Sequence, residues 1–275
     1  MRTRVAAVAL TVLTAACAAI PLRVPDGPSR PLAASDAVTI FVQASSVCRG
    51  VRTLTAEIGL SGRVGSRKLR GRVLAGFERS GSLRLEAPAP FGAPVFILAA
   101  RANRSVIWFP RDKRVLRDAA VADVLEAMTG MRWQPDELLA LLTGCLVSDP
   151  QVEATDARRF ESSWVAMPLS GGAEAFIRSE RQRWRIVGGR GPGGGGDRAT
   201  PSWAVAYDEF AAGFPGRVRV SQAPTTDVTF RVSQLEANVA IDPAAFALTV
   251  PPDAVPMSLD ELRQMGPLAD RGPER

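Results

Sequence analysis

The chain has 275 residues, of which 46% are hydrophobic and 23% are charged, and its formal net charge is +6. This balance predicts a folded chain with a substantial core and excludes wholesale disorder. The chain has no histidine, which excludes Ser-His-Asp and Cys-His catalysis as well as zinc sites with histidine ligands.

The N-terminal residues are typical of a bacterial export signal. Arg2 and Arg4 precede an uncharged apolar run from Val5 to Ala16, and small residues surround its end. We therefore expect residues 1–16 to be a signal peptide. The sequence LTAAC at residues 13–17 resembles a lipobox, in which the cysteine is diacylated, so it predicts a lipid anchor on Cys17.

Two alternatives stay open for this segment. Ala16-Cys17-Ala18 also resembles a site for the ordinary signal peptidase, which would release an unanchored periplasmic protein. An uncleaved transmembrane helix over residues 5–22 ranks last, because Pro21 and many small residues disfavour it. Enteric bacteria mark inner-membrane lipoproteins with Asp after the cysteine, so Ala18 favours the outer membrane.

The anchor is followed by a tether and one domain. Residues 17–35 contain four prolines and predict an extended, lipid-anchored tether. No linker interrupts residues 36–275. A first helix is expected to be capped by Ser35, and five of its residues fall near one face: Val38, Phe41, Val42, Ser45 and Cys48.

Alternating apolar and polar residues dominate the rest of the domain, which is the pattern of strands with one buried face. The clearest strands cover residues 53–60, 69–77, 83–86, 183–186, 217–220, 227–232 and 235–241. Short helices are expected at 121–128, at 135–142 with Pro135 in the first turn, and near 258–264. The run from Gly188 to Gly196 is expected to be a loop between strands. About ten strands with helices on one side predict an α+β, barrel-like fold.

Two cysteines remain after export, and they would lie in an oxidising compartment. Cys48 and Cys145 therefore predict a disulfide, with two buried free thiols as the alternative. In the chain-entropy model, closing a loop of about 100 residues stabilises the fold by up to about 4.7 kcal/mol.

The strand positions that are expected to point inward carry large apolar residues. A curled sheet of ten strands encloses more space than its side chains fill unless helices plug it. The interior is therefore either a packed core or an apolar cavity for a lipid chain, with the helices as a lid. The candidate lining residues are Leu54, Ile58, Leu60, Val73, Phe77, Leu85, Phe96, Leu98, Trp108, Trp184 and Phe230.

One turn between strands is rich in proline. Phe91 lies between prolines in the segment from Pro88 to Pro94, which cannot extend a strand ladder. This residue is either a plug in the core or an exposed tip that enters a membrane.

Motifs for catalysis and nucleic-acid binding are missing from the sequence. The glycine run has no P-loop lysine, no nucleophile elbow occurs, and the carboxylates are scattered singly. We expect no enzyme activity, metal site or cofactor. The arginines alternate with apolar residues and have few aromatic neighbours, which is typical of a solvated basic face and disfavours nucleic acid as a partner.

Several segments, in order along the chain, resemble the LolB family of outer-membrane lipoprotein receptors and, more distantly, their LolA carriers. They are the PFG turn at 90–92, VLEAMTGMRWQP at 124–135 with LLTG at 141–144, and WAVAY at 203–207 with PGRVRV at 215–220. The resemblance implies an unclosed antiparallel barrel over helices, a cavity for acyl chains of lipoproteins, and a periplasmic LolA-like carrier as a partner. It also places Phe91 at the family's membrane-inserting position.

The resemblance leads to a first functional hypothesis. The protein would be anchored through Cys17, hold acyl chains in its cavity and deliver them to the outer membrane. The alternative is an envelope interaction module with a filled barrel. The chain departs from the family in its length, its cysteine pair and its C-terminal extension from Leu248. Such departures would also fit a lipid-binding subfamily that does not insert lipoproteins.

Overall fold

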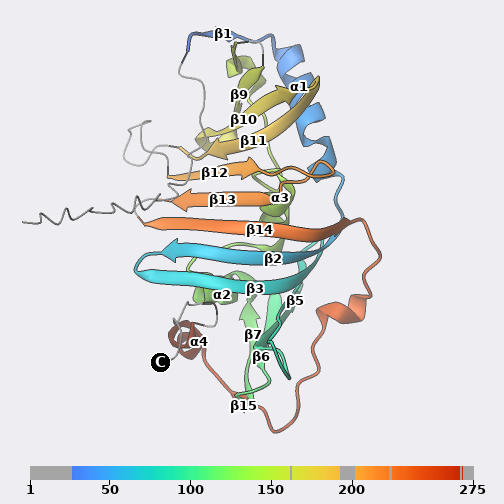
Figure 1. Ribbon diagram of the computed structural model, residues 1–275, viewed down its shortest axis with the longest axis vertical. Coiled ribbons are helices and arrows are strands. Elements are labelled where there is room, and N and C mark those ends of the chain that lie inside the picture. The colour runs from blue at the N-terminus through green and yellow to red at the C-terminus, as the bar shows by residue number, and fades with distance from the viewer. Residues whose placement is uncertain (1–26, 162, 193–201, 223–224, 267, 269–275) are drawn as a thin grey trace, which may run out of the picture.

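The computed structural model describes residues 27–161, 163–192, 202–222, 225–266 and 268. One unclosed sheet of 15 strands forms its framework, in the order β1-β8-β9-β10-β11-β12-β13-β14-β2-β3-β4-β5-β6-β7-β15 (Figure 1). Neighbouring strands are antiparallel except β15 and β7, which are parallel. The predicted α+β fold with an open, curled sheet is confirmed, but the sheet has more strands than the ten expected.

The strands follow the alternation seen in the sequence, but they are longer and more numerous. Their bounds are β1 (Ser29–Pro31), β2 (Thr53–Val64), β3 (Arg67–Glu78), β4 (Ser82–Ala87), β5 (Phe96–Arg101), β6 (Arg104–Phe109), β7 (Arg114–Ala120), β8 (Arg158–Phe160), β9 (Trp164–Leu169), β10 (Ala173–Glu180), β11 (Arg183–Arg190), β12 (Trp203–Asp208), β13 (Arg217–Gln222), β14 (Thr226–Ala237) and β15 (Val255–Pro256).

The alternation determines which face of the sheet is buried. In β2, Leu54 and Ile58 are buried at the inner face, whereas Glu57 between them is only half-buried on the outer face. The antiparallel register places Leu54 opposite Phe77 of β3, which is also fully buried. Repeated across the sheet, this pairing produces one continuous apolar inner face.

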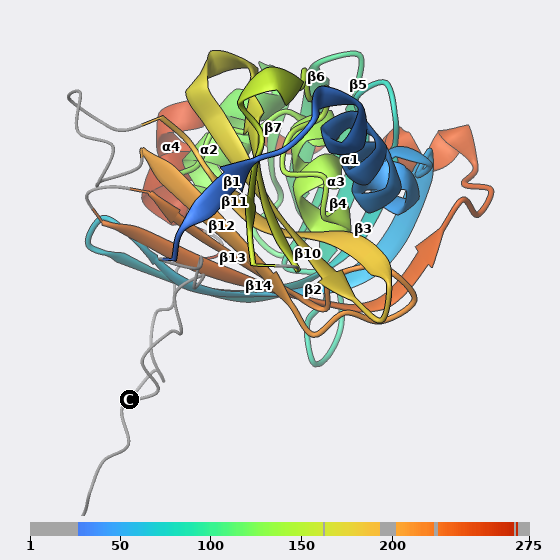
Figure 2. The same cartoon turned by 90° about the horizontal axis from the view of Figure 1, so that it is seen from above.

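Four helices are present in the described part of the chain, namely α1 (Ala34–Arg49), α2 (Val121–Thr129), α3 (Pro135–Thr143) and α4 (Leu259–Met265). Figure 2 shows α1, α2 and α3 inside the curve of the sheet, where they cover its inner face. The residues expected from the sequence are found at the ends of α2 and α3. Gly130 and Gly144 adopt left-handed conformations after α2 and α3, and Gln134 and Glu137 form a capping box at the start of α3.

Helix α1 differs from its prediction in two respects. It begins at Ala34, so Ser35 lies inside the helix and caps nothing, while its N-cap residue is Ala33. Its buried face includes Phe41 and Cys48, whereas Val38 and Val42 remain about half exposed. The buried face is therefore rotated from the predicted one, because Ala37 and Ile40 are buried in place of Val38 and Val42.

Three boundaries also differ from the sequence predictions. Residues 227–232 and 235–241 were expected as two strands, but β14 runs unbroken from Thr226 to Ala237 with an irregularity between Ser233 and Glu236. Residues 188–190 belong to strand β11 and not to a loop, and residues 193–196 of that run lie outside the described residues. Strand β1 pairs with β8, so the folded unit begins before residue 36.

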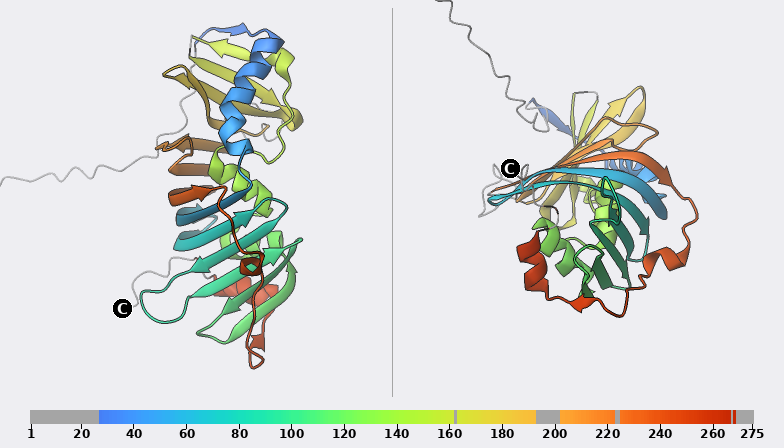
Figure 3. Two further views of the ribbon diagram at one scale, coloured as in Figure 1. Left: turned by 90° about the vertical axis from the view of Figure 1, so that its right-hand side faces the viewer. Right: turned by 60° about the horizontal axis from the view of Figure 1, so that its bottom comes forward.

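The C-terminal segment after β14 wraps around the lower half of the sheet (Figure 3). The short 3-10 helix η4 (Pro243–Phe246) contacts β4 and β5, and Phe246 is buried there. Strand β15 then pairs with β7, and α4 contacts α2 with Leu262 fully buried. This segment covers an edge of the sheet that would otherwise expose unpaired backbone groups.

Candidate functional site

The predicted lining residues lie together at the centre of the molecule, with two exceptions. Nine of the eleven belong to one buried cluster between the sheet and the helices: Leu54, Ile58, Leu60, Val73, Phe77, Leu85, Phe96, Leu98 and Phe230. Trp184 is half-buried and packs against the margin of this cluster. Strand alternation therefore located the inner face at these nine positions.

Trp108 was placed on the wrong face. It belongs to the apolar run Ile107-Trp108-Phe109, in which the sequence does not show which residues point inward. Ile107 and Phe109 are the members of the central cluster, so Trp108 points to the outer face. The pairing of β6 with β5 determines which residues of β6 point inward, because Ile107 pairs with Leu98, which is itself an inner-face residue.

Helices α2 and α3 occupy the interior of the curled sheet. Met128 of α2 and Leu139 and Leu142 of α3 are almost completely buried. Trp133, between the two helices, lies over Phe230 with ring centroids 5.7 Å apart. The predicted lining residues thus form a packed layer against the helices, and none of them lines the surface pockets that lie next to Pro31, Thr55, Ala211 and Gly62. In this conformation they are not the wall of an open cavity.

Few polar groups tie α2 and α3 to the sheet. Arg67 of β3 donates a hydrogen bond to the carbonyl of Ala127 at 3.5 Å, and the Gly81 amide donates to Asp136 at 3.2 Å. After α3, the Leu146 amide donates to the hydroxyl of Tyr207 at 3.1 Å. The helices are therefore held mainly by apolar contacts, which have no fixed direction and can be exchanged for contacts with another apolar group.

A disulfide fastens the helices at one end. Cys48 in the last turn of α1 is bonded to Cys145, which lies two residues after α3, and their Cα atoms are 5.6 Å apart. Both cysteines are buried beside Ala140. The bond joins α1 to the end of α3, whereas α2 contains no cysteine and is held at its start by its direct continuation from β7.

The proline-rich turn is exposed. Phe91 leaves 88% of its surface in solvent, and Val95 in the same loop is exposed to 37%. Arg111, from the turn between β6 and β7, holds the loop by donating hydrogen bonds to the carbonyls of Phe91 at 2.7 Å and Ala93 at 3.3 Å. Of the two options that the sequence left open, the structure shows an exposed tip on a braced loop.

Several arginines of the strands are paired with acidic residues on the outer face of the sheet. Asp208 of β12 accepts a hydrogen bond from Arg219 of β13 at 2.8 Å and lies 3.4 Å from Arg217. Glu209 also contacts Arg217, and it lies 3.5 Å from Arg231 of β14. These cations are neutralised by carboxylates on neighbouring strands, as expected for a solvated face.

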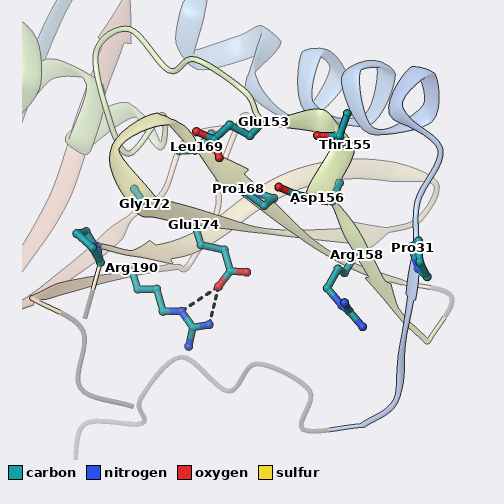
Figure 4. A pocket seen from close by; sticks show the side chains of 14 residues that line it. Pro31, Glu153, Thr155, Asp156, Arg158, Pro168, Leu169, Gly172, Glu174 and Arg190 are labelled. Atoms are coloured by element: carbon teal, nitrogen blue, oxygen red, sulfur yellow. Dashed lines mark hydrogen bonds and ion pairs between the residues drawn. The ribbon is translucent and has the colours of Figure 1, made fainter. Parts of the chain in front are cut away.

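A pocket with a volume of about 650 Å³ lies at the β1 end of the sheet (Figure 4). Arg190 and Glu174 form an ion pair of 2.7 Å on one side of it, and Arg158 donates to the hydroxyl of Ser29 at 2.7 Å on the other. The sequence analysis missed this pocket, since residues from five separate segments build it. Its lining mixes both charges, so it does not select one class of ligand.

The remaining predictions concern metal ions, membrane-spanning helices and the N-terminal segment. In the described part of the chain, no group of three or more Cys, Asp or Glu side chains is arranged to hold a metal ion, and no helix has the length and hydropathy to span a membrane. Cys17, the signal peptide 1–16 and most of the tether lie outside the described residues.

Comparison with known proteins gives distant structural similarity only. No family model matches the sequence, and no curated protein matches it significantly. The fold is similar to a DUF1329 family protein from Desulfovibrio piger at 12% identity and a TM-score of 0.46, covering 78% of this chain and 97% of that one. A LolA superfamily protein from Nitrosomonas europaea gives 9% identity, a TM-score of 0.46 and coverage of 76% and 96%.

The lipoprotein LppX of Mycobacterium tuberculosis shares 12% identity, with a TM-score of 0.30 and coverage of 76% of this chain and 99% of that one. All three TM-scores are below 0.5, so we base no step of the functional argument on these similarities.

Proposed function

We propose that this protein is an envelope lipoprotein that binds acyl chains of lipids or lipoproteins at the inner face of its sheet and delivers them to the outer membrane. One observation carries the proposal. The apolar inner face of an unclosed sheet is covered by two nine-residue helices that have few polar ties to it. The N-terminal signal and Cys17 support the envelope location, and exposed Phe91 supports contact with a membrane.

The binding step requires the helices to move, because protein side chains fill the interior. An acyl chain would replace the contacts that Met128, Leu139 and Leu142 make with the sheet. Each buried CH₂ group contributes ~0.8 kcal/mol, so a chain of a dozen carbons gains ~10 kcal/mol relative to water. That gain is of the size needed to offset the apolar surface exposed when the helices are displaced.

Binding of a fluorescent fatty acid, and its displacement by a diacylated lipopeptide, tests the proposal. A cysteine pair that fastens the end of α2 to the sheet provides the sharpest comparison. A Cβ atom on Gly130 would lie 3.3 Å from Cβ of Val64, close to the separation in disulfides. We expect wild type to bind the probe and oxidised Val64→Cys/Gly130→Cys to bind at least tenfold more weakly.

The matched control is Val64→Ala/Gly130→Cys, which places the same side chain in the left-handed conformation of Gly130 but forms no bond. We expect this control to retain probe binding. Absence of binding by folded wild type, or equal binding by the locked and control variants, would contradict the proposal.

The filled interior favours one other function, an envelope module that docks on a partner and carries no lipid. The same experiment separates the two, because a docking module would bind no acyl probe in either form.

A further inference from the structure

The tip of the β2–β3 hairpin carries an unusual set of charges. The twelve residues from Ser61 to Arg72 contain five cations and no acidic residue. Both strands are long, and their tip lies at the left edge of the sheet in Figure 1, beside the start of β14. The tip therefore presents a concentrated positive charge at one edge of the molecule.

Two of the five cations are used inside the protein. Arg67 points to the inner side, where it donates hydrogen bonds to carbonyls of Ala127 and Arg263. Arg72 forms an ion pair of 3.5 Å with Glu57. Arg63, Lys68 and Arg70 are exposed, and their side chains form no ion pair within the described residues. Since all three occupy outer-face positions, they form one cationic surface, which we term the hairpin patch.

The register of the hairpin places two of these cations directly opposite each other. Arg63 is the cross-strand partner of Lys68. Like charges in this position destabilise a sheet, and a carboxylate at either position would remove the repulsion. Arg217 and Arg231 also face each other across strands, but both contact the carboxylate of Glu209. On its other side Arg63 is the cross-strand partner of Asp227 of β14. The hairpin patch and this neighbour together hold three cations and one carboxylate, so they keep a net positive charge.

A groove of about 540 Å³ lies beside the patch. Arg63, Lys68 and two glycines line one side of it, and Thr225, Thr226 and Asp227 line the other. Threonine hydroxyls and cations are both donors to phosphate oxygens. Asp227 is the one acidic group in the lining, so the two cations and neighbouring Arg70 leave the surface positive.

We infer that the hairpin patch binds the phosphate-bearing headgroups of an anionic lipid surface. A ligand with many negative charges relieves the repulsion between Arg63 and Lys68, and exposed cations on a protruding edge reach a flat surface without rearrangement. The inference deepens the proposed membrane role, but it does not depend on acyl binding by the inner face.

Vesicle flotation tests the inference with the mature chain carrying Cys17→Ser, so that no lipid anchor contributes to vesicle binding. The vesicles are phosphatidylcholine alone or with about 30% phosphatidylglycerol, at low and at physiological ionic strength. We expect Arg63→Gln/Lys68→Gln/Arg70→Gln to bind the anionic vesicles about 100-fold more weakly than wild type, about fivefold for each cation. Inorganic phosphate at the concentration of the headgroups should not release wild type, which separates a lipid surface from a free anion site.

The matched control removes three other exposed arginines, Arg101→Gln/Arg181→Gln/Arg183→Gln, and changes the net charge equally. We expect this variant to keep at least a third of wild-type binding. Equal loss in both variants would show a general effect of net charge and would overturn the inference, as would full binding by the patch variant.

Lys68→Glu provides a second test, in which stability and vesicle binding should change in opposite directions. The carboxylate would face Arg63, so we expect the melting temperature to rise while vesicle binding falls. A loss of binding accompanied by a lower melting temperature would indicate damage to the fold and would not support the inference. Acyl-probe binding should be unchanged in all these variants, which keeps this test separate from that of the proposed function.

Discussion

Phe91 exposes 88% of its surface to water on a loop braced by Arg111. Transfer of a side chain of this size to an apolar phase contributes ~1.5–3 kcal/mol, and a braced loop loses little conformational entropy when that transfer occurs. An exposed aromatic on a rigid turn is therefore suited to contact with lipid. The same residue makes almost no contribution to the core, so it can be changed without loss of the fold.

We predict that, in a chain carrying Cys17→Ser and therefore no lipid anchor, Phe91→Glu weakens association with neutral phosphatidylcholine vesicles about tenfold and leaves thermal stability and acyl-probe binding unchanged. The carboxylate would have to be dehydrated to enter the bilayer, which opposes insertion. Phe91→Leu is the matched control and should retain association. Parallel loss of vesicle association and probe binding in Phe91→Glu would mean that the turn supports the core.

At the scale of single elements, the disulfide between α1 and the end of α3 is the strongest constraint on the helices. It closes a loop with a sequence separation of 97 residues, and the segments that it joins otherwise have few contacts with each other. The free energy of the fold therefore depends on a bond that forms only in an oxidising compartment.

We predict that Cys48→Ala/Cys145→Ala lowers the free energy of unfolding by about 2–5 kcal/mol, measured by urea denaturation under oxidising conditions. Alanine fits the site, because both cysteines are buried beside Ala140. Wild type treated with a reductant after unfolding should match the variant. Equal stability of oxidised wild type and the variant would show that helix packing alone determines the position of α3.

At the scale of the whole molecule, the C-terminal segment ties the last strand of the sheet to the helices. Glu261 of α4 accepts hydrogen bonds from the Ser258 amide at 2.6 Å and from Arg114 of β7 at 2.7 Å. These contacts, the first above all, lower the pKa of Glu261 to about 2 from 4.5. The group is well solvated, so salt weakens the contact with Arg114.

The direction of this pKa shift predicts how stability depends on pH. A pKa lowered by folding stabilises the native state above the unfolded value of 4.5, and this contribution is lost as the pH falls from 4.5 toward 2. We expect Glu261→Gln to be less stable than wild type at pH 6, with a difference that shrinks below pH 4. Denaturation curves at several pH values measure it, and a constant difference would contradict the assignment.

The local features of this fold could be predicted from the sequence because nearby residues cause them. Alternation in β2 and β3 located both the strands and their buried face, since side chains in a strand point to opposite sides in turn. Pro135, Gly130 and Gly144 marked the ends of α2 and α3, because their backbone conformations suit helix ends and little else.

Only the tertiary structure decided which apolar residues share one interior. Trp108 lies between two apolar neighbours, so its face depends on strand register and not on its own sequence context. Phe91 could be buried or exposed until the positions of the adjacent strands and Arg111 were known. Whether α2 and α3 fill the curled sheet depends on its curvature and on side chains distant in sequence. Alternation identifies an apolar face, but the space that remains above it is determined by the packing of the whole chain.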